Sequence, residues 1–485
     1  MSKIIYLVQK NFDLKVIQKL EELGHDVTTV CFRHRDWIES NKRNILNPIS
    51  FPLFWKSRVE DRLDEGWHQK LSEYKRMYAL KEMARYSYLD IGRSRIPGGT
   101  ISDDEYLNDL IITFFIENGV LDADFCVGEL SKSFNLLCYD ICQSRGGDYL
   151  HYVGLAFEKG MAFTDDKFNL VSMNRRWNKL GAIDKDKIVE IVRRKVDDFK
   201  KKPEYQLTGI NTKKVSFKSF MKRLLSRLGS LHSEVEAYSI DKQYRLDQFY
   251  VNPVLRFIRN NPLVNFRYLS NKLRWKKLAN QDLPREKYFY YSLHVQPETT
   301  TSLFSEFSID EVSQQGALVE LLAKQMPTGT VLVVKDHPYM SDKRSANIYK
   351  KLVGYPNLVF LPPWFDQFKI IKNCLGVITC VGTVGIEGRM LSKPVCVLEN
   401  VYYSGLNVYR TENIRDVKDF CLKVLEGSQN QDFSRDELEF LAKIYNCISQ
   451  SVENAIEEFF PGQDNNKNIE KLVEGLLAEY EYRKA

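Results

Sequence analysis

The sequence predicts an α/β protein with two parallel-sheet domains and helical insertions. The second domain is predicted by three apolar, β-branched runs that end abruptly in a polar or glycine-bearing turn, with helical patterns between them. These runs are 288–301 (YFYYSLHVQPETTT), 331–340 (VLVVKDHPYM) and 375–398 (LGVITCVGTVGIEGRMLSKPVCVL). Strands buried on both faces read as continuous apolar runs, and parallel strands need a crossover helix between them. The pattern is typical of a nucleotide-binding half-domain.

The first half of the chain opens with a β-α-β unit. Its strands are expected over 3–8 and 26–32, and its helix is expected over 13–24. The charged and aromatic stretch 55–92 has long helical periodicity, which predicts a helical insertion. Further elements are expected as a helix over 105–118, a strand over 123–127 and a helix over 133–142. The first half is therefore predicted to be an α/β domain as well.

The length of the chain and a proline-bearing, charged segment predict a division into three parts. At 485 residues it is too long for one ordinary core. Proline and charge in QDLPREK (281–287) precede a new buried strand, which marks a boundary. We expect an α/β domain with a basic helical insertion over 1–284, a nucleotide-binding domain over 285–426, and C-terminal helices over 427–485 that pack across both.

Composition excludes several classes of protein. An apolar content of 44% with 28% charged residues is typical of a soluble globular chain. The formal net charge of +6 is modest for this length and gives no argument for nucleic acid as a partner. Nine cysteines without C-x-x-C pairs or zinc spacing predict a reducing, cytoplasmic setting. No run approaches the roughly 18 apolar residues of a transmembrane helix, so any contact with the inner membrane is expected to be peripheral.

A basic amphipathic helix is predicted between Lys213 and Arg227. The segment holds six basic residues and no acidic one, and its apolar residues recur at helical spacing on another face. Such a helix can lie on an anionic membrane surface or bind an acidic partner. The alternative, which is the commoner arrangement, is a surface helix whose apolar stripe packs on its own domain.

Polar residues beyond the carboxyl ends of the strands are site candidates, because ligands of open α/β sheets bind there. His337 and Pro338 directly follow the run VLVVKD. Proline restricts the residue before it to an extended conformation, so the imidazole is held at the strand end. A histidine there can donate to a phosphate or polarise a leaving group. We expect a functional role for His337, although a lone histidine is more often structural.

The turn CVGTVGIEGRML is the second candidate and places Gly382 and Thr383 between a strand and a helix. Backbone N–H groups at a helix start, the helix dipole and the threonine hydroxyl can together hold a phosphate. Glu387 falls one turn later, on a face that could reach a ribose or sugar hydroxyl. The alternative is a capping threonine followed by a helix-stabilising glutamate, and both roles can coexist.

Three further polar side chains are candidates. Gln296 and Glu298 follow the run YFYYSLHV, where the amide suits a base or sugar edge. Glu298 could equally stabilise the first turn of a helix. Glu129 follows ADFCVG in the first half and could act as a general base, a nucleophile or a positioning group.

No metal site is predicted. Asp122 with Asp124 and Asp184 with Asp186 match D-x-D superficially. The first pair precedes a buried strand and the second lies at an expected helix start, so both are assigned structural roles. Several cysteines, Cys126 among them, lie in apolar runs where a free thiol packs as a small hydrophobe.

Three ordered motifs resemble the capsular polysaccharide biosynthesis family. They are the strand ending in L-H-V-Q-P-E, the strand ending in K-D-H-P, and the turn V-I-T-x-x-G-T-V-G-I-E-G followed by K-P-V. The similarity covers 288–410 and extends to the first half through the β-α-β start and 121–166. The family comprises bacterial glycosyltransferases of the GT-B kind, including Kdo transferases that use CMP-Kdo. The resemblance implies two Rossmann-like domains facing a cleft, with the donor in the second and the acceptor in the first.

The resemblance also implies roles for single residues. His337, Pro338 and Thr383 are expected to contact the nucleotide phosphate, and Glu387 to lie near the nucleotide sugar. No metal or other cofactor is expected, because positive side chains and helix ends stabilise the departing phosphate. The sequence departs from the family at Val381, where many members carry serine, and in GLAFEKGMAF (154–163), which lacks the expected arginine.

Together these features predict a metal-independent glycosyltransferase that acts on a bacterial surface polysaccharide or glycolipid, with CMP-Kdo as the first candidate donor. The predicted catalytic residues are Glu129 and His337. The predicted donor-binding residues are Gln296, Glu298, His337, Pro338, Gly382, Thr383 and Glu387. A sialyltransferase or a CDP-glycerol-type polymerase could share the His-Pro element. A non-catalytic scaffold that binds glycan or membrane is the alternative from another class.

Overall fold

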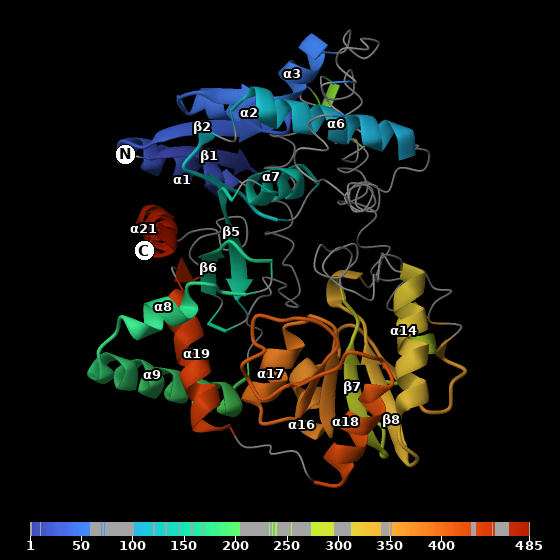
Figure 1. Cartoon of the computed structure of the whole chain (residues 1–485). Helices are drawn as coiled ribbons and strands as arrows, with labels where there is room; N and C mark the ends of the chain where they lie inside the picture. Colours follow the sequence, from blue (N-terminus) through green and yellow to red (C-terminus); the bar gives the residue numbers. More distant parts are fainter. Residues whose placement is uncertain are drawn as a thin grey trace.

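The computed structural model of the chain contains two sheets, each with helices packed on both faces (Figure 1). The described residues are 2–9, 11–58, 101–119, 122–130, 133–144, 146–155, 157–158, 160–167, 169–203, 273–294, 312–340, 352–427, 433–448, 450–451 and 465–484, with the isolated positions 69, 72, 232, 235, 238, 239, 254 and 349.

The first sheet has the strand order β13-β6-β5-β4-β1-β2-β3. Its strands are β1 (Lys3–Val8), β2 (Asp26–Cys31), β3 (Pro48–Ser50), β4 (Phe125–Val127), β5 (Asp148–Leu155), β6 (Gly160–Thr164) and β13 (Gln450–Ser451). The strands from β3 to β5 are parallel, whereas β6 and β13 run antiparallel to their neighbours. The chain leaves β1 toward β2 and returns to its other side at β4, so the sheet is doubly wound.

Helices cover both faces of the first sheet. They are α1 (Asn11–Glu22), α3 (Phe51–Arg58), α6 (Ile101–Glu117), α7 (Ser133–Ser144) and α21 (Asn465–Lys484), and α2 (His34–Lys42) connects β2 to β3. Side chains alternate between the faces of a strand. Ile5 and Leu7 accordingly pack with α3, α6 and α7. Ile4 and Tyr6 pack on the opposite face with α1 and the C-terminal helix α21, which lies beside α1 (Figure 1).

The second sheet is entirely parallel and has the order β12-β11-β10-β7-β8-β9. Its strands are β7 (Lys287–Ser292), β8 (Thr330–Lys335), β9 (Leu358–Leu361), β10 (Gly376–Thr379), β11 (Val395–Val397) and β12 (Tyr409–Arg410). The helical segments between and after them are α14 (Val312–Gln325), the 3-10 turn η4 (Pro338–Met340), α16 (Gln367–Asn373), α17 (Val384–Met390) and α18 (Asp416–Leu425).

The aromatic strand β7 shows how the second sheet is buried on both faces. Tyr288 and Tyr290 pack in the layer that contains α16 and α17. Phe289 and Tyr291 pack in the opposite layer, which contains α14 and α18. All four side chains are buried, which is why this strand reads as a continuous apolar run.

Three further helices are α8 (Met173–Asn178), α9 (Ala182–Lys201) and α19 (Arg435–Cys447). Helix α19 packs against α8 and α9, α9 also contacts α17 of the second unit, and α19 contacts β6 of the first sheet. Phe199 of α9 meets Phe368 of α16 edge to face, with ring centroids 5.8 Å apart. Arg389 of α17 forms an ion pair with Glu437 of α19, Nη2 to Oε1 2.7 Å. Their apolar side chains join one cluster with residues of β5, β6 and the second sheet.

The predicted α/β class with two Rossmann-like units is confirmed by the two doubly wound sheets. Strands or helices lie in every described range where the sequence predicted them, within a few residues. The hairpin of β5 and β6 and the strand β9 were not predicted. The predicted insertion 55–92 is described only to 58 and at two single positions, and the basic segment from Lys213 to Arg227 lies outside the described residues.

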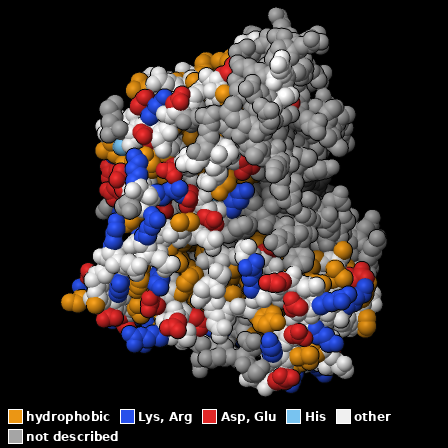
Figure 2. Space-filling model, in the orientation of Figure 1, with side chains coloured by type: hydrophobic (Ala, Val, Ile, Leu, Met, Phe, Trp, Pro, Cys, Tyr) orange, Lys and Arg blue, Asp and Glu red, His pale blue; other side chains and the backbone are white. Residues whose placement is uncertain are grey.

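The described surface carries mixed charge. In the face drawn in Figure 2, lysine and arginine side chains are interspersed with aspartate and glutamate. Within the described part of the chain, no helix has the length and apolar character needed to cross a bilayer.

Candidate functional site

The order of the second sheet indicates where a ligand of this fold binds. The chain leaves β7 toward β8 and β9 and then returns to the other side of β7 at β10. All neighbouring strands are parallel, so their carboxyl ends lie at one edge. In open α/β sheets the ligand site lies at this edge, where the strand order reverses. We call residues 293–294, 336–338 and 380–383, which follow β7, β8 and β10, the second switch point.

His294 joins the two strands on either side of the reversal. It follows β7, is 7% exposed, and its Nε2 accepts a hydrogen bond from the backbone N–H of Cys380 at 3.3 Å. Because Nε2 accepts, the neutral imidazole carries its proton on Nδ1. The sequence reasoning passed over His294, although it ends the same run that leads to Gln296.

Gly382 is required by a close approach to this histidine. A Cβ at residue 382 would lie 2.8 Å from His294 Cε1 and 2.8 Å from Thr379 Oγ1. The backbone N–H of Gly382 donates to Thr379 Oγ1 at 3.0 Å, and its carbonyl accepts from the hydroxyl of Tyr403 at 2.6 Å. The turn is therefore fixed from both sides, and its glycine is explained by packing.

Thr383 is the N-cap residue of α17, but its side chain makes no capping hydrogen bond. The capping alternative raised from the sequence is therefore not what the hydroxyl does. Thr383 is half-buried and directly follows Gly382. Its hydroxyl can serve as a donor or an acceptor to a ligand at the second switch point.

His337 and Pro338 lie at the carboxyl end of β8, as predicted. The N–H of His337 donates to Asp336 Oδ1 at 2.7 Å, and its carbonyl accepts from the N–H of Met340 at 2.9 Å. Asp336 is fully buried and also accepts from the hydroxyl of Tyr349. The backbone of His337 is thus held by two hydrogen bonds, while its side chain is only partly buried.

A buried polar cluster lies at the end of β8 and the start of α16. Lys335 is 1% exposed, and burial lowers the pKa of its ammonium to about 8 against the opposing effect of Asp336, Glu387 and Asp366. Glu387 is 2% exposed and accepts from Gln367 Nε2 at 2.6 Å. Gln367 is thus its described hydrogen-bond partner, and the place of Glu387 near a sugar hydroxyl stays a prediction.

The first sheet has a corresponding edge, formed by Gln9 after β1 and residues 128–130 after β4, which we call the first switch point. Gln9 Nε2 donates to the carbonyl of Glu129 at 3.2 Å. The hydroxyl of Tyr152 donates to Glu129 Oε2 at 3.3 Å. Glu129 is half-buried. A carboxylate held by a phenol in this position can accept a proton or orient a hydroxyl group.

Packing also explains the glycine that precedes Glu129. A Cβ at Gly128 would lie 2.6 Å from Asn135 Nδ2 and 2.6 Å from the hydroxyl of Tyr149. Asn135 also accepts from Gln9. Asn135 and Gln9 therefore tie α7 and β1 to the turn that carries Glu129. Neither was singled out from the sequence, since a lone amide gives no signal without its partners.

The remaining predicted residues divide into two groups. Gln296 and Glu298 lie outside the described residues. The aspartates of the two D-x-D matches have structural contacts: Asp124 Oδ2 accepts from the N–H of Lys3 at 2.8 Å, and Asp184 lies in the first turn of α9. In the described ranges, the group of side chains with metal-binding geometry is not carboxylate but sulfur: Cys126, Cys138 and Cys142.

Solved structures resemble the chain only distantly. KpsC from Thermosulfurimonas dismutans, a beta Kdo 2,7 transferase, aligns at 12% identity over 45% of this chain and 63% of its own, with a TM-score of 0.25. A second structure of KpsC from the same organism, described as a beta Kdo 2,4 transferase, aligns at 12% identity. The alignment covers 69% of this chain and 85% of that one, with a TM-score of 0.31. The Methanocaldococcus jannaschii UDP-GlcNAc 2-epimerase aligns at 13% identity over 92% and 99%, with a TM-score of 0.30. Superpositions this loose establish neither a common fold nor a common activity.

The sequence itself matches a protein family over its second α/β unit. No curated protein matches the chain. The family model described as capsule polysaccharide biosynthesis protein matches residues 263–420, about a third of the chain. The matched range contains β7, β8, β10 and β11 together with the whole second switch point. Residues 263–420 are thus similar to the capsule polysaccharide biosynthesis family.

Proposed function

We propose that the protein is a glycosyltransferase that moves a sugar from a nucleotide donor to a bacterial surface polysaccharide or glycolipid. The observation that carries this proposal is that the family match spans the second sheet and includes both His337 and the 380–383 turn. A family defined by capsule synthesis needs enzymes that build glycans, and a doubly wound sheet offers a nucleotide site at its switch point.

The donor binds at the second switch point in this proposal. Two groups contact the phosphate in this proposal. They are the half-buried side chain of His337 and the hydroxyl of Thr383, which makes no capping hydrogen bond to α17. Asp336 anchors the backbone of His337, and Gly382 allows the turn to approach His294. Gln296 and Glu298 follow His294 closely in the chain and are proposed to contact the base or sugar.

Glu129 is the proposed catalytic carboxylate. It removes the proton from the acceptor hydroxyl, whose oxygen then bonds to the anomeric carbon of the donor sugar. The bond from that carbon to the phosphate oxygen breaks, and the nucleotide leaves with the electron pair. His337 and Thr383 stabilise the charge on the departing phosphate, so the step is proposed to need no metal.

CMP-Kdo is the first candidate donor, on the strength of the L-H-V-Q-P-E, K-D-H-P and V-I-T-x-x-G-T motifs. A sialyltransferase and a CDP-glycerol-type polymerase are the alternative enzymes with the same His-Pro element. We also propose that the basic segment from Lys213 to Arg227 brings the enzyme to the anionic inner face of the membrane, where a glycolipid acceptor would lie.

A nucleotide screen tests the proposal. Thermal unfolding of the full chain is followed with CMP, CDP, UDP and GDP, and a ligand at 100 times its dissociation constant stabilises the fold by about 2.7 kcal/mol. CMP stabilisation followed by acceptor-dependent release of CMP from CMP-Kdo is the expected result. Stabilisation by another nucleotide instead of CMP would mean that the donor sugar is carried by that nucleotide. Stabilisation by none of the four favours the non-catalytic scaffold.

A further inference from the structure

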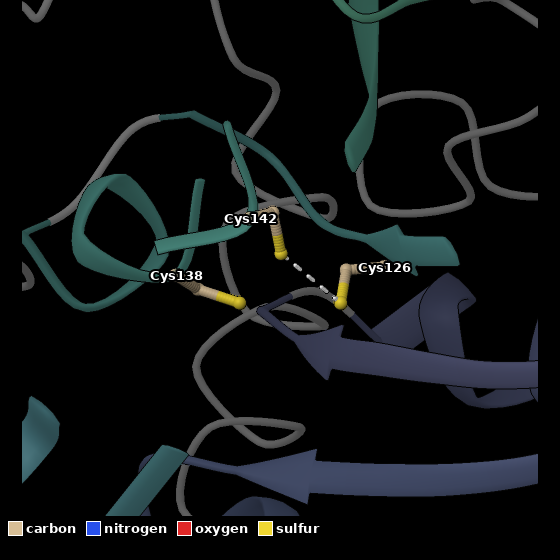
Figure 3. Close-up of side chains that lie close together, drawn as sticks. All are labelled: Cys126, Cys138 and Cys142. Atoms are coloured by element: carbon tan, nitrogen blue, oxygen red, sulfur yellow. Dashed lines mark hydrogen bonds between the residues drawn. The ribbon is translucent and has the colours of Figure 1, made fainter. Parts of the chain in front are cut away.

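Three buried cysteines converge between the first sheet and a helix that covers it. Cys126 lies on β4, and Cys138 and Cys142 lie one turn apart on α7. Their Sγ atoms are all within 4.8 Å of one another, and Cys142 Sγ donates to Cys126 Sγ at 3.5 Å. The three residues are 1%, 0% and 4% exposed. Figure 3 shows the three side chains with their sulfur atoms close together.

Cysteine binds metal as the thiolate. The three sulfur atoms lie close enough together to bind one ion in common.

The spacing suits a single ion. A metal about 2.3 Å from each of three sulfur atoms separates those atoms by about 4 Å, so small side-chain movements would close the site. Among the described residues, no histidine or carboxylate joins the three sulfur atoms as a further ligand. A structural zinc ion almost always has four protein ligands, so a set of three sulfur atoms fits zinc poorly. Cu(I) is one of the soft cations that thiolates bind.

We propose that Cys126, Cys138 and Cys142 form a buried three-sulfur site for a thiophilic cation of low coordination number, of which Cu(I) is the type. The ion replaces thiol protons, which pass to solvent. It ties β4 to α7, and these two elements also position the first switch point, because β4 leads to Glu129 and α7 carries Asn135. The ion would therefore stabilise that edge of the first domain.

The site is tested by titrating the reduced full chain with Cu(I), without oxygen and against a competing Cu(I) chelator. The expected result is one tightly bound Cu(I) per chain, with three sulfur neighbours in X-ray absorption and a higher midpoint of thermal unfolding. Zn²⁺ in the same titration is expected to bind at least tenfold more weakly. A copper ion with nitrogen or oxygen neighbours in the wild-type protein, or no bound copper at all, overturns the proposal without any variant.

Matched substitutions separate this site from the other cysteines. Cys138→Ser and Cys138→Ala are each expected to weaken Cu(I) binding at least a hundredfold, with folding checked by circular dichroism. Cys374→Ser is the control, because Cys374 is equally buried and donates to the carbonyl of Ile371 in the second domain. Equal affinity in Cys138→Ala and Cys374→Ser contradicts the assignment. Nucleotide binding is not part of this test, so its outcome is independent of the proposed transferase activity.

Discussion

Gly382 lies against the ring of His294, so close that a Cβ at residue 382 would stand 2.8 Å from His294 Cε1. The two residues are contributed by the turns that follow β10 and β7, the strands on either side of the reversal in strand order. Their contact sets the shape of the second switch point.

Gly382→Ala is expected to displace His294 or the turn, because overpacking a fitted site costs about 1–3 kcal/mol. We expect a loss of nucleotide affinity of about tenfold or more, since each tenfold corresponds to about 1.4 kcal/mol. Titration calorimetry with the best nucleotide checks this. Gly354→Ala is the control, because a Cβ at residue 354 meets nothing within 4 Å. Equal affinity in the two variants would show that the close approach has no bearing on the ligand.

Lys335 makes stability depend on pH. Its pKa falls from 10.5 to about 8 through burial, so between these values the unfolded chain binds more protons than the folded chain. Stability therefore rises with pH from about 8 to 10.5, by up to about 3 kcal/mol. Denaturant unfolding across this range should show the rise in the wild type and not in Lys335→Met. If the free energy of unfolding changed with pH in the same way in both proteins, burial would not lower the pKa of Lys335.

The ion pair between Arg389 and Glu437 holds α19 to α17. Both side chains are almost fully buried, at 0% and 3% exposure, and Nη2 lies 2.7 Å from Oε1. Removing one partner leaves a buried charge alone, so Arg389→Met is expected to cost about 3–5 kcal/mol. The double substitution Arg389→Met with Glu437→Leu should recover part of this loss. Denaturant unfolding measures all three.

A second ion pair on α19 provides the matched control for that loss. Lys443 and Glu439 lie on the exposed side of the helix, with side chains 23% and 44% exposed. Exposed pairs contribute about 0–1 kcal/mol. If Lys443→Met destabilises the protein as much as Arg389→Met does, burial is not the reason for the loss.

Glu129→Gln separates binding from chemistry. The amide keeps the shape of the side chain but cannot take a proton, so transfer is expected to slow by about 10²–10⁴-fold. Nucleotide affinity should be unchanged, because Glu129 lies in the first sheet and the donor is proposed to bind at the second. Glu22→Gln, at an exposed carboxylate of α1, should leave both unchanged. A rise in the nucleotide dissociation constant with normal turnover would assign Glu129 a different role.

The strands of the second sheet could be predicted because they are buried on both faces. The aromatic run of β7 and the valines of β8 have no polar face, and that continuity is visible in one sequence. Strand β9, LVFL, was not predicted. The hairpin of β5 and β6 was missed because its turn holds Glu158 at a φ of 59°. A glycine at this left-handed position would have indicated a turn, whereas a glutamate does not.

The positions of His337 and Gly382 were predictable, because each follows the end of a continuous apolar strand. Contacts of the candidate site between residues distant in sequence were not predictable. His294 and Cys380 meet across 86 positions, and nothing in either run indicates the contact. The burial of Lys335 likewise depends on the helices packed over β8. Cys126, Cys138 and Cys142 match no known metal-binding spacing, because one of them comes from a strand and the other two from a helix.

We propose that His337 contacts the phosphate of a nucleotide donor at the second switch point. The direct test is transfer from CMP-Kdo by wild type and His337→Ala, with the free energy of unfolding measured on both. In His337→Ala, transfer is expected to be abolished and nucleotide affinity to fall. The free energy of unfolding is expected to change by less than about 1 kcal/mol, since the side chain of His337 is only partly buried. Transfer by His337→Ala at a near-normal rate would contradict it.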